Sequence, residues 1–109
     1  MSAPIDLDHL NRYVFGDRAL LAEVLAIFKE QATSISAGMT PAMDDGAWRL
    51  AAHTLKGAAR GVGAWALGDA AERAEEAGAV DDRARALKAI VDLARSAADY
   101  AGQVIDEAA

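Results

Sequence analysis

The most reactive stretch of this 109-residue chain surrounds His53, one of its two histidines. Residues 51–61 read AAHTLKGAARG, which places Lys56 three positions after His53 and Gly57 four positions after it. An imidazole can act as a nucleophile, and a lysine three residues further along a helix can reach the space above the ring. A nucleophile beside a cation suits the acceptance of an anionic group, and a phosphoryl group in particular.

A helical wheel indicates which side of this segment faces solvent. At about 100° per residue, one apolar stripe collects within about 40° of Trp48 on either side. The stripe consists of Trp48, Ala52, Leu55, Ala59 and Val62. On the same wheel His53 falls at about 140° and Gly57 at about 180°, on the opposite side. We therefore expect His53 to point into solvent rather than into a core.

Three cations and one leucine share this outer face with His53. Arg49, Lys56 and Arg60 fall at about 80° to 120°, while Leu50 lies on the other side of the same face. These cations would stabilise an anionic group on the imidazole. The segment 46–68 contains only these three charged residues, although the whole chain has a net charge of -6. We expect Arg49, Leu50 and Arg60 to contact a partner.

Gly57 is an unfavourable residue for a helix interior, where it is less stable than alanine by about 1 kcal/mol. It lies one turn beyond His53, so any side chain there would stand beside a group attached to the imidazole. We interpret the missing side chain as clearance that lets a partner protein approach the helix backbone. A small substrate would not need that space.

Hydrophobic periodicity predicts helices along almost the whole chain and no strands. The helices are expected at about 6–14, from 18 to a boundary at 44–46, at 47–60, at 64–77, and from 81 or 82 to about 105. Asp17 is a plausible N-cap of the second helix. The expected fold is all-α: an antiparallel four-helix bundle with a short additional N-terminal helix, forming a single domain over residues 1–109.

Composition excludes several classes of function. The chain has no cysteine, which excludes thiolate metal sites and fits the cytoplasm, and we expect no bound metal. Its first residues do not form a secretory signal, no stretch is long and apolar enough for a membrane span, and the negative charge argues against nucleic acid. No phosphate-binding loop for ATP occurs, and residues 61–66, GVGAWA, follow a helix rather than the strand that a dinucleotide site requires.

Residues 53–59, HTLKGAA, resemble the His-x-x-Lys-Gly-small-small motif of the histidine phosphotransfer (HPt) domain family. The similarity continues through Val62, Gly63, Ala64, Leu67 and Glu75, and it covers about residues 45–77 closely. This resemblance implies a four-helix bundle in which His53 accepts a phosphoryl group on its exposed ring nitrogen.

The resemblance also implies partners and roles. The phosphoryl group would pass between His53 and the aspartyl phosphate of a response-regulator receiver domain or a hybrid histidine kinase, with Mg²⁺ only on the receiver and no cofactor here. Lys56 would neutralise the phosphate and Gly57 would provide clearance. Glu75 stands where some relatives carry an amide that holds the imidazole, and Arg60 adds a cation where relatives often have a small or polar residue. Such a protein is a phosphoryl carrier, not an enzyme.

Some assignments stay open from the sequence alone. Phe28 and Leu25 are candidates for apolar docking residues beside His53, although both also fit a core. Trp48 and Trp65 are expected to fill the core, although either would also fit the edge of the docking face. The acidic pairs 75–76 and 81–82 are expected to be solvated helix ends.

The alternative function is a helical adaptor that binds a partner through an apolar helix face without chemistry. A third reading, the dimerisation helix of a sensor kinase, would need an acidic residue and a proline where Thr54 and Ala58 stand. We expect a monomer, and Met1 favours a free-standing chain.

Overall fold

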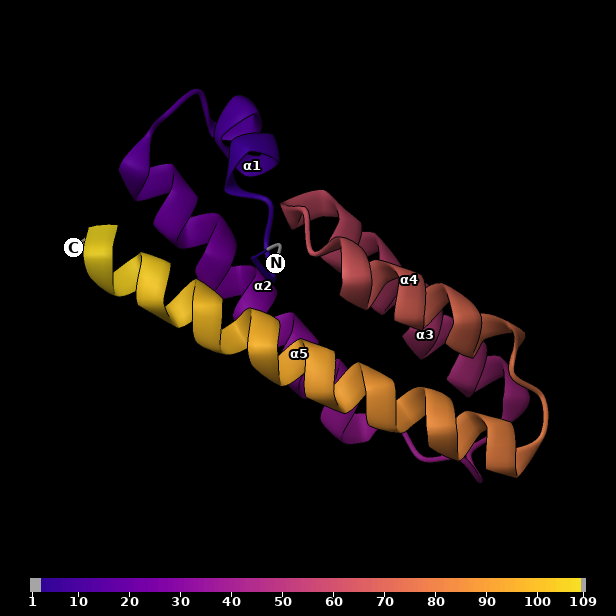
Figure 1. Cartoon of the computed structure of the whole chain (residues 1–109). Coiled ribbons are helices and arrows are strands. Elements are labelled where there is room, and N and C mark those ends of the chain that lie inside the picture. The colour runs from indigo at the N-terminus through magenta and orange to yellow at the C-terminus, as the bar shows by residue number, and fades with distance from the viewer. Residues whose placement is uncertain (1–2, 109) are drawn as a thin grey trace.

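The computed structural model describes residues 3–108, in which five α-helices and no strand occur. Their bounds are α1 Leu7–Val14, α2 Arg18–Gly38, α3 Asp45–Val62, α4 Trp65–Glu76 and α5 Val80–Ala108. Each of α2 to α5 packs against two of the other three, which closes the four into an antiparallel bundle (Figure 1). The short α1 packs on α2 and α3. The predicted fold class is therefore confirmed.

The helices differ in length, and this difference explains the position of α1. With 29 residues α5 spans about 43 Å at 1.5 Å per residue, which matches the longest dimension of the molecule, 43 Å. The shorter α3 and α4 cover only part of the α2–α5 pair. The N-terminal segment and α1 occupy the remaining end (Figure 1), where Ile5, Leu10 and Val14 are buried.

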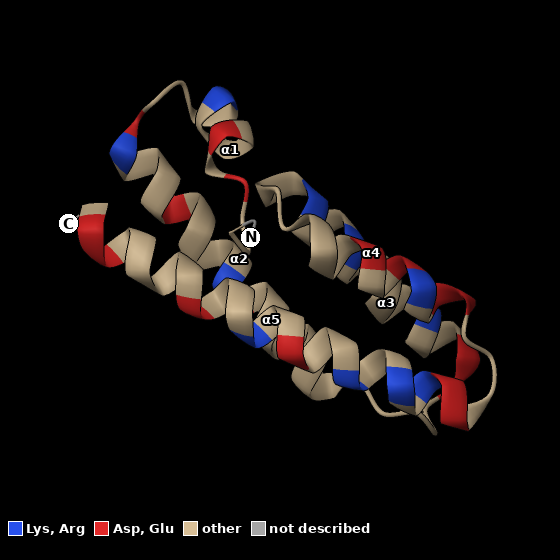
Figure 2. Ribbon diagram, viewed as in Figure 1, with Lys and Arg blue, Asp and Glu red and all other residues tan. Residues whose placement is uncertain are grey.

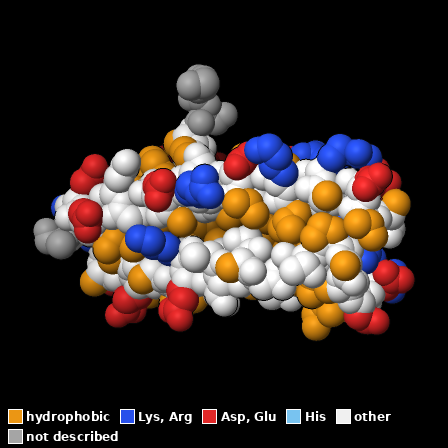
Figure 3. All heavy atoms as spheres, turned by 90° about the horizontal axis from the view of Figure 1, so that it is seen from below, with side chains coloured by type: hydrophobic (Ala, Val, Ile, Leu, Met, Phe, Trp, Pro, Cys, Tyr) orange, Lys and Arg blue, Asp and Glu red, His pale blue; other side chains and the backbone are white. Residues whose placement is uncertain are grey.

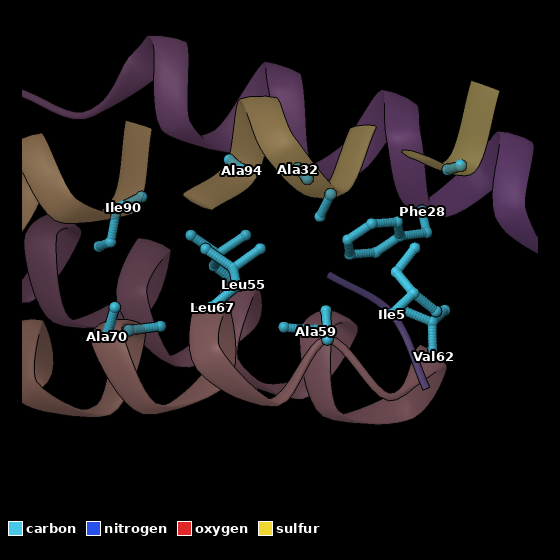
Figure 4. Packing of buried hydrophobic residues seen from close by; sticks show 14 of the residues in the cluster. Ile5, Phe28, Ala32, Leu55, Ala59, Val62, Leu67, Ala70, Ile90 and Ala94 are labelled. Atoms are coloured by element: carbon cyan, nitrogen blue, oxygen red, sulfur yellow. The ribbon is translucent and has the colours of Figure 1, made fainter. Parts of the chain in front are cut away.

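The core contains the apolar stripes of all four long helices. The α3 stripe predicted from the wheel is buried at every position, from Trp48 to Val62. Phe28 of α2 lies close to Ile5 and Val62 in the interior (Figure 4). Many other core positions are alanines, among them Ala32, Ala70 and Ala94, and such small side chains let helices approach closely. Because the α3 stripe is buried, the opposite face of α3 is fixed as a surface.

Helix boundaries follow the capping residues and Pro41. Asp17 caps α2 by accepting a hydrogen bond from the Leu20 amide at 3.1 Å, as predicted. Asp44 caps α3 in the same way through the amides of Gly46 and Ala47. The second helix ends at Gly38, earlier than the predicted boundary at 44–46, because the residue before a proline disfavours helical backbone and the chain is already extended at Met39.

Trp65 corrects a prediction. It was expected in the core but begins α4 with 44% of its surface exposed. Its indole nitrogen donates a hydrogen bond to Asp6 Oδ2 at 3.1 Å. Its ring packs edge to face with the His9 ring, and the two ring centroids are 4.8 Å apart. Trp65 therefore helps to attach the N-terminal segment to the bundle. Trp48 is fully buried, as predicted, and donates to the Ala74 carbonyl at 2.7 Å.

Arg83 is a buried charge that joins the two loops at one end of the bundle. Its guanidinium donates to the carbonyls of Pro41, Met43 and Ala77 at 3.1 to 3.4 Å, and to Asp45 Oδ1 at 2.7 Å. It also lies 5.2 Å from the centre of the Trp48 ring. A buried cation is stable only when its donors find acceptors, and these four hydrogen bonds occupy most of the donors of the guanidinium. The loop before α3 and the loop before α5 thus share one anchor.

No helix within residues 3–108 is both long enough and apolar enough to cross a lipid bilayer.

We predict that Arg83→Met lowers the free energy of unfolding by about 2 to 4 kcal/mol, because it removes the buried donors for three loop carbonyls. Urea unfolding followed by circular dichroism measures the change. Arg85→Met is the matched control, since Arg85 is exposed and within residues 3–108 its one ion pair is with Asp82. Equal, small effects of both substitutions would contradict the anchoring role.

Candidate functional site

α3 presents His53 to solvent, as the wheel predicted. The His53 side chain is 67% exposed, while Ala52 and Leu55 on either side of it in the sequence are fully buried. The position of His53 follows from the burial of the apolar stripe, because rotating α3 to bury the ring would expose Trp48. The imidazole is thus held on a rigid helix and remains open to a partner.

Glu75 of α4 joins His53 and Lys56 into one cluster. Its Oε1 atom lies 2.6 Å from Lys56 Nζ and 3.4 Å from His53 Nδ1. The side chains of Lys56 and Glu75 are only 20% and 23% exposed, and Oε1 itself is shielded from solvent. The expectation that 75–76 is a solvated helix end is therefore wrong for Glu75, although it holds for the exposed Glu76.

The cluster changes the acidity of its carboxylate. The Lys56 ammonium lowers the pKa of the Glu75 carboxyl from its ordinary value, first by its hydrogen bond and then by its charge. Partial burial of Glu75 opposes this shift, and His53 adds a smaller contribution that lowers the pKa further. Glu75 is therefore an anion at neutral pH, held between an ammonium and an imidazole nitrogen.

The carboxylate favours one tautomer of the neutral His53 ring. Its Oε1 atom lies 3.4 Å from Nδ1, so the negative charge favours a proton on that nitrogen. In this tautomer the lone pair lies on Nε2. This tautomer combines an oriented ring with a free nucleophilic nitrogen, which is the arrangement that group transfer to histidine requires.

Arg60 points away from the predicted position beside His53. Arg60 turns toward α4, where its Nη2 lies 3.2 Å from Glu72 Oε2 and 3.5 Å from Asp69 Oδ1. Gly68 makes room for it, since a Cβ at that position would lie 2.9 Å from Arg60 Cγ. Acidic residues of α4 therefore pair with Lys56 and Arg60 of α3, and the two signs lie side by side on this helix pair (Figure 2). Arg60 is not part of the His53 cluster.

Arg49 and Leu50 lie on the exposed outer face of α3, as predicted. Arg49 is one turn before His53 and forms no ion pair with any residue from 3 to 108. Leu50 is one of the few large apolar side chains left in contact with water, with 67% of its surface exposed. Both are available to a partner.

Gly57 has open space where its side chain would be. A Cβ built on Gly57 would meet no other atom within 4 Å. Packing within the chain therefore does not require a glycine at this position. The opposite holds at Gly63, where the backbone φ is +83° and a Cβ would lie 2.9 Å from the Asp6 carbonyl oxygen.

Phe28 corrects a sequence-based assignment. It was a candidate for the partner surface, but it is buried in the core together with Leu25. The large apolar residues that α2 does expose are Leu20 and Ile27, and Ile27 lies on the far side of the helix from Leu25.

The rest of the described surface has a groove and apolar patches, but no cluster suited to a metal ion. Among residues 3–108, the histidine and acidic side chains form no group of three that could hold a metal ion. A shallow groove between α2 and α5 is lined by small and polar residues, including Ala37, Ala94 and Ala98. Hydrophobic side chains form a band along the molecule when it is viewed from below (Figure 3).

The family model described as Hpt domain matches residues 20–103 of the chain. The match includes α3 and α4 completely and most of α2 and α5. No curated protein and no solved structure matches closely enough to name a relative.

We predict that Gly57→Ala raises the free energy of unfolding by about 0.5 to 1 kcal/mol, because alanine is a better helix former and meets no atom there. Gly63→Ala is the contrasting variant and is expected to destabilise the chain through its positive φ and its contact with Asp6. Urea unfolding of both variants provides the comparison. A loss of stability in Gly57→Ala would mean that the fold itself needs this glycine.

The lowered pKa of Glu75 predicts a pH-dependent contribution to stability. A carboxylate whose pKa is lower in the folded state stabilises the fold above its ordinary value, 4.5, and loses this contribution as the pH falls through the lowered value. The difference in unfolding free energy between the wild type and Glu75→Gln should therefore be largest at neutral pH and shrink in acid.

The matched control is Glu76→Gln. It removes an exposed carboxylate that forms no ion pair with any residue from 3 to 108. Its effect should stay flat over the same range. A Glu75→Gln difference that does not change with pH would contradict the ion pair with Lys56.

Proposed function

Since the chain belongs to the Hpt domain family, we propose that it carries a phosphoryl group on His53 between receiver domains of a two-component phosphorelay. A role in phosphotransfer is the property of this family as a whole. The observation that supports His53 as the acceptor is its exposed imidazole, with Nδ1 directed at Glu75 and Lys56 beside it.

The reaction is a reversible transfer between an oxygen and a nitrogen. The Nε2 lone pair of His53 attacks the phosphorus of an aspartyl phosphate on the receiver, the P–O bond to the aspartate breaks, and the aspartate leaves as a carboxylate. Nδ1 keeps its proton throughout, so no proton has to move at the acceptor nitrogen. The reverse step returns the phosphoryl group to an aspartate of the next receiver.

Lys56 and Arg49 are the cations that we assign to the phosphoryl group. Lys56 is already in the cluster, and Arg49 lies one turn before His53 without an ion pair among residues 3–108. Arg60 is a weaker candidate for this role because Glu72 and Asp69 hold it on α4. It can still contact a docked partner at the edge of the site.

Docking of a receiver explains the outer face of α3. The partner must bring its aspartate within bonding distance of Nε2, which requires its backbone to come close to α3. Gly57 offers that clearance at no steric penalty within the chain, and Leu50 offers apolar surface beside it. Phe28 has no part in this contact, because it is buried.

The chain acts in this scheme as a carrier, not as an enzyme. Mg²⁺ and the chemistry of the aspartyl phosphate belong to the receiver domain, and the phosphoryl group enters the relay from a histidine kinase or its receiver. We place this monomeric carrier in the cytoplasm, with which the lack of cysteine agrees.

The test is transfer of labelled phosphate from a phosphorylated receiver domain to the chain. We expect the wild type and His9→Gln to accept the label and His53→Gln to accept none, because His9 is packed against Tyr13 and Trp65 and its Nε2 is buried. Label on His53→Gln would overturn the proposal. Binding of a receiver with no transfer to the wild type would favour the adaptor alternative.

A further inference from the structure

Lys56 already has an anionic partner in the unphosphorylated protein. Its Nζ lies 2.6 Å from Glu75 Oε1, a closer approach than the 3.4 Å between the same oxygen and His53 Nδ1. The contact is partly shielded from water, because both side chains are less than one quarter exposed and Oε1 has no access to solvent. The main partner of this carboxylate is therefore the ammonium rather than the imidazole.

A phosphoryl group on Nε2 would attract the same ammonium, in addition to Arg49. It brings strong acceptor oxygens and close to two negative charges at neutral pH, as phosphate esters do. An ammonium held at 2.6 Å by a carboxylate is partly neutralised, so its attraction for a second anion is reduced. Arg60 does not replace it, since Glu72 and Asp69 hold that guanidinium.

We propose, on the basis of the function assigned to His53, that Glu75 is a positioning residue that competes with the phosphoryl group for Lys56. In the unphosphorylated protein the carboxylate holds the ammonium beside the ring. On phosphorylation the ammonium turns to the phosphoryl oxygens and its ion pair with Glu75 weakens. The strength of the Glu75–Lys56 pair then sets how far phosphorylation of His53 proceeds, and keeps the group transferable instead of trapped.

This competition predicts a specific coupling between two substitutions. Removing Lys56 should reduce phosphorylation of His53 only modestly while Glu75 is present, because Glu75 already offsets the ammonium. The same substitution should reduce it more strongly once the carboxylate has been replaced by a neutral amide. A residue that only orients the imidazole would show no such dependence on Lys56.

A small-molecule donor tests the coupling without a receiver domain. N-phosphoimidazole and free imidazole are equilibrated with the wild type, Lys56→Met, Glu75→Gln and the double variant, and ³¹P NMR gives the phosphorylated fraction. One N–P bond breaks in the donor and one forms at Nε2, while each ring keeps the proton on its other nitrogen. The equilibrium constant therefore reports the surroundings of the phosphoryl group. His53→Gln supplies the baseline for label elsewhere.

We expect Lys56→Met to lower the equilibrium constant by a factor about five larger in the Glu75→Gln background than in the wild type, the size expected for a partly exposed ion pair. An equal factor in both backgrounds, or a larger loss with Glu75 present, would overturn the inference while leaving His53 as the acceptor. Absence of label on His53 in every variant would overturn the proposed function as well.

Discussion

Burial of one apolar stripe on α3 is the constraint on which the site depends. From Trp48 to Val62 the stripe is buried at each helical turn. The indole N–H of Trp48 also donates a hydrogen bond to the Ala74 carbonyl of α4. These contacts leave α3 no freedom to rotate. The geometry of the helix therefore places the residues of the opposite face, including His53 and Gly57, on the surface.

The other helix of the pair, α4, places carboxylates beside the exposed histidine and the cations of α3. α4 runs antiparallel to α3 and supplies carboxylates at Asp69, Glu72 and Glu75, three residues apart, along the edge where α3 carries Lys56 and Arg60. These contacts give the cations fixed positions and reduce the positive charge of the basic segment. Among these three carboxylates, Glu75 is the one that lies within 4 Å of the imidazole, and it therefore links the ion pairs of the two helices to His53.

Properties that depend on a single helix could be predicted from the sequence. The phase of α3, the exposure of His53 and the Asp17 cap follow from the period of 3.6 residues and from capping rules, and the structure agrees with all three. The motif at residues 53–59 also indicated the Hpt domain family, whose family model matches residues 20–103.

Properties that depend on how two helices meet could not be predicted in the same way. Arg83 is buried because two loops that are about 40 residues apart in sequence converge on it. No local sequence pattern predicts this burial. The exposure of Trp65 follows from its contacts with Asp6 and His9 of the N-terminal segment. The ion pair between Lys56 and Glu75 needs the register of α3 against α4, which a wheel of one helix does not contain.

The most direct measurement identifies the ring nitrogen that carries phosphorus. Nitrogen-15 NMR of the phosphorylated protein detects the coupling between phosphorus and the nitrogen bonded to it. Because Nδ1 of His53 faces the Glu75 carboxylate, phosphorus should couple to Nε2 of His53 and the proton should stay on Nδ1. Phosphorus on Nδ1 of His53, or on either nitrogen of His9, would contradict the site as it is described.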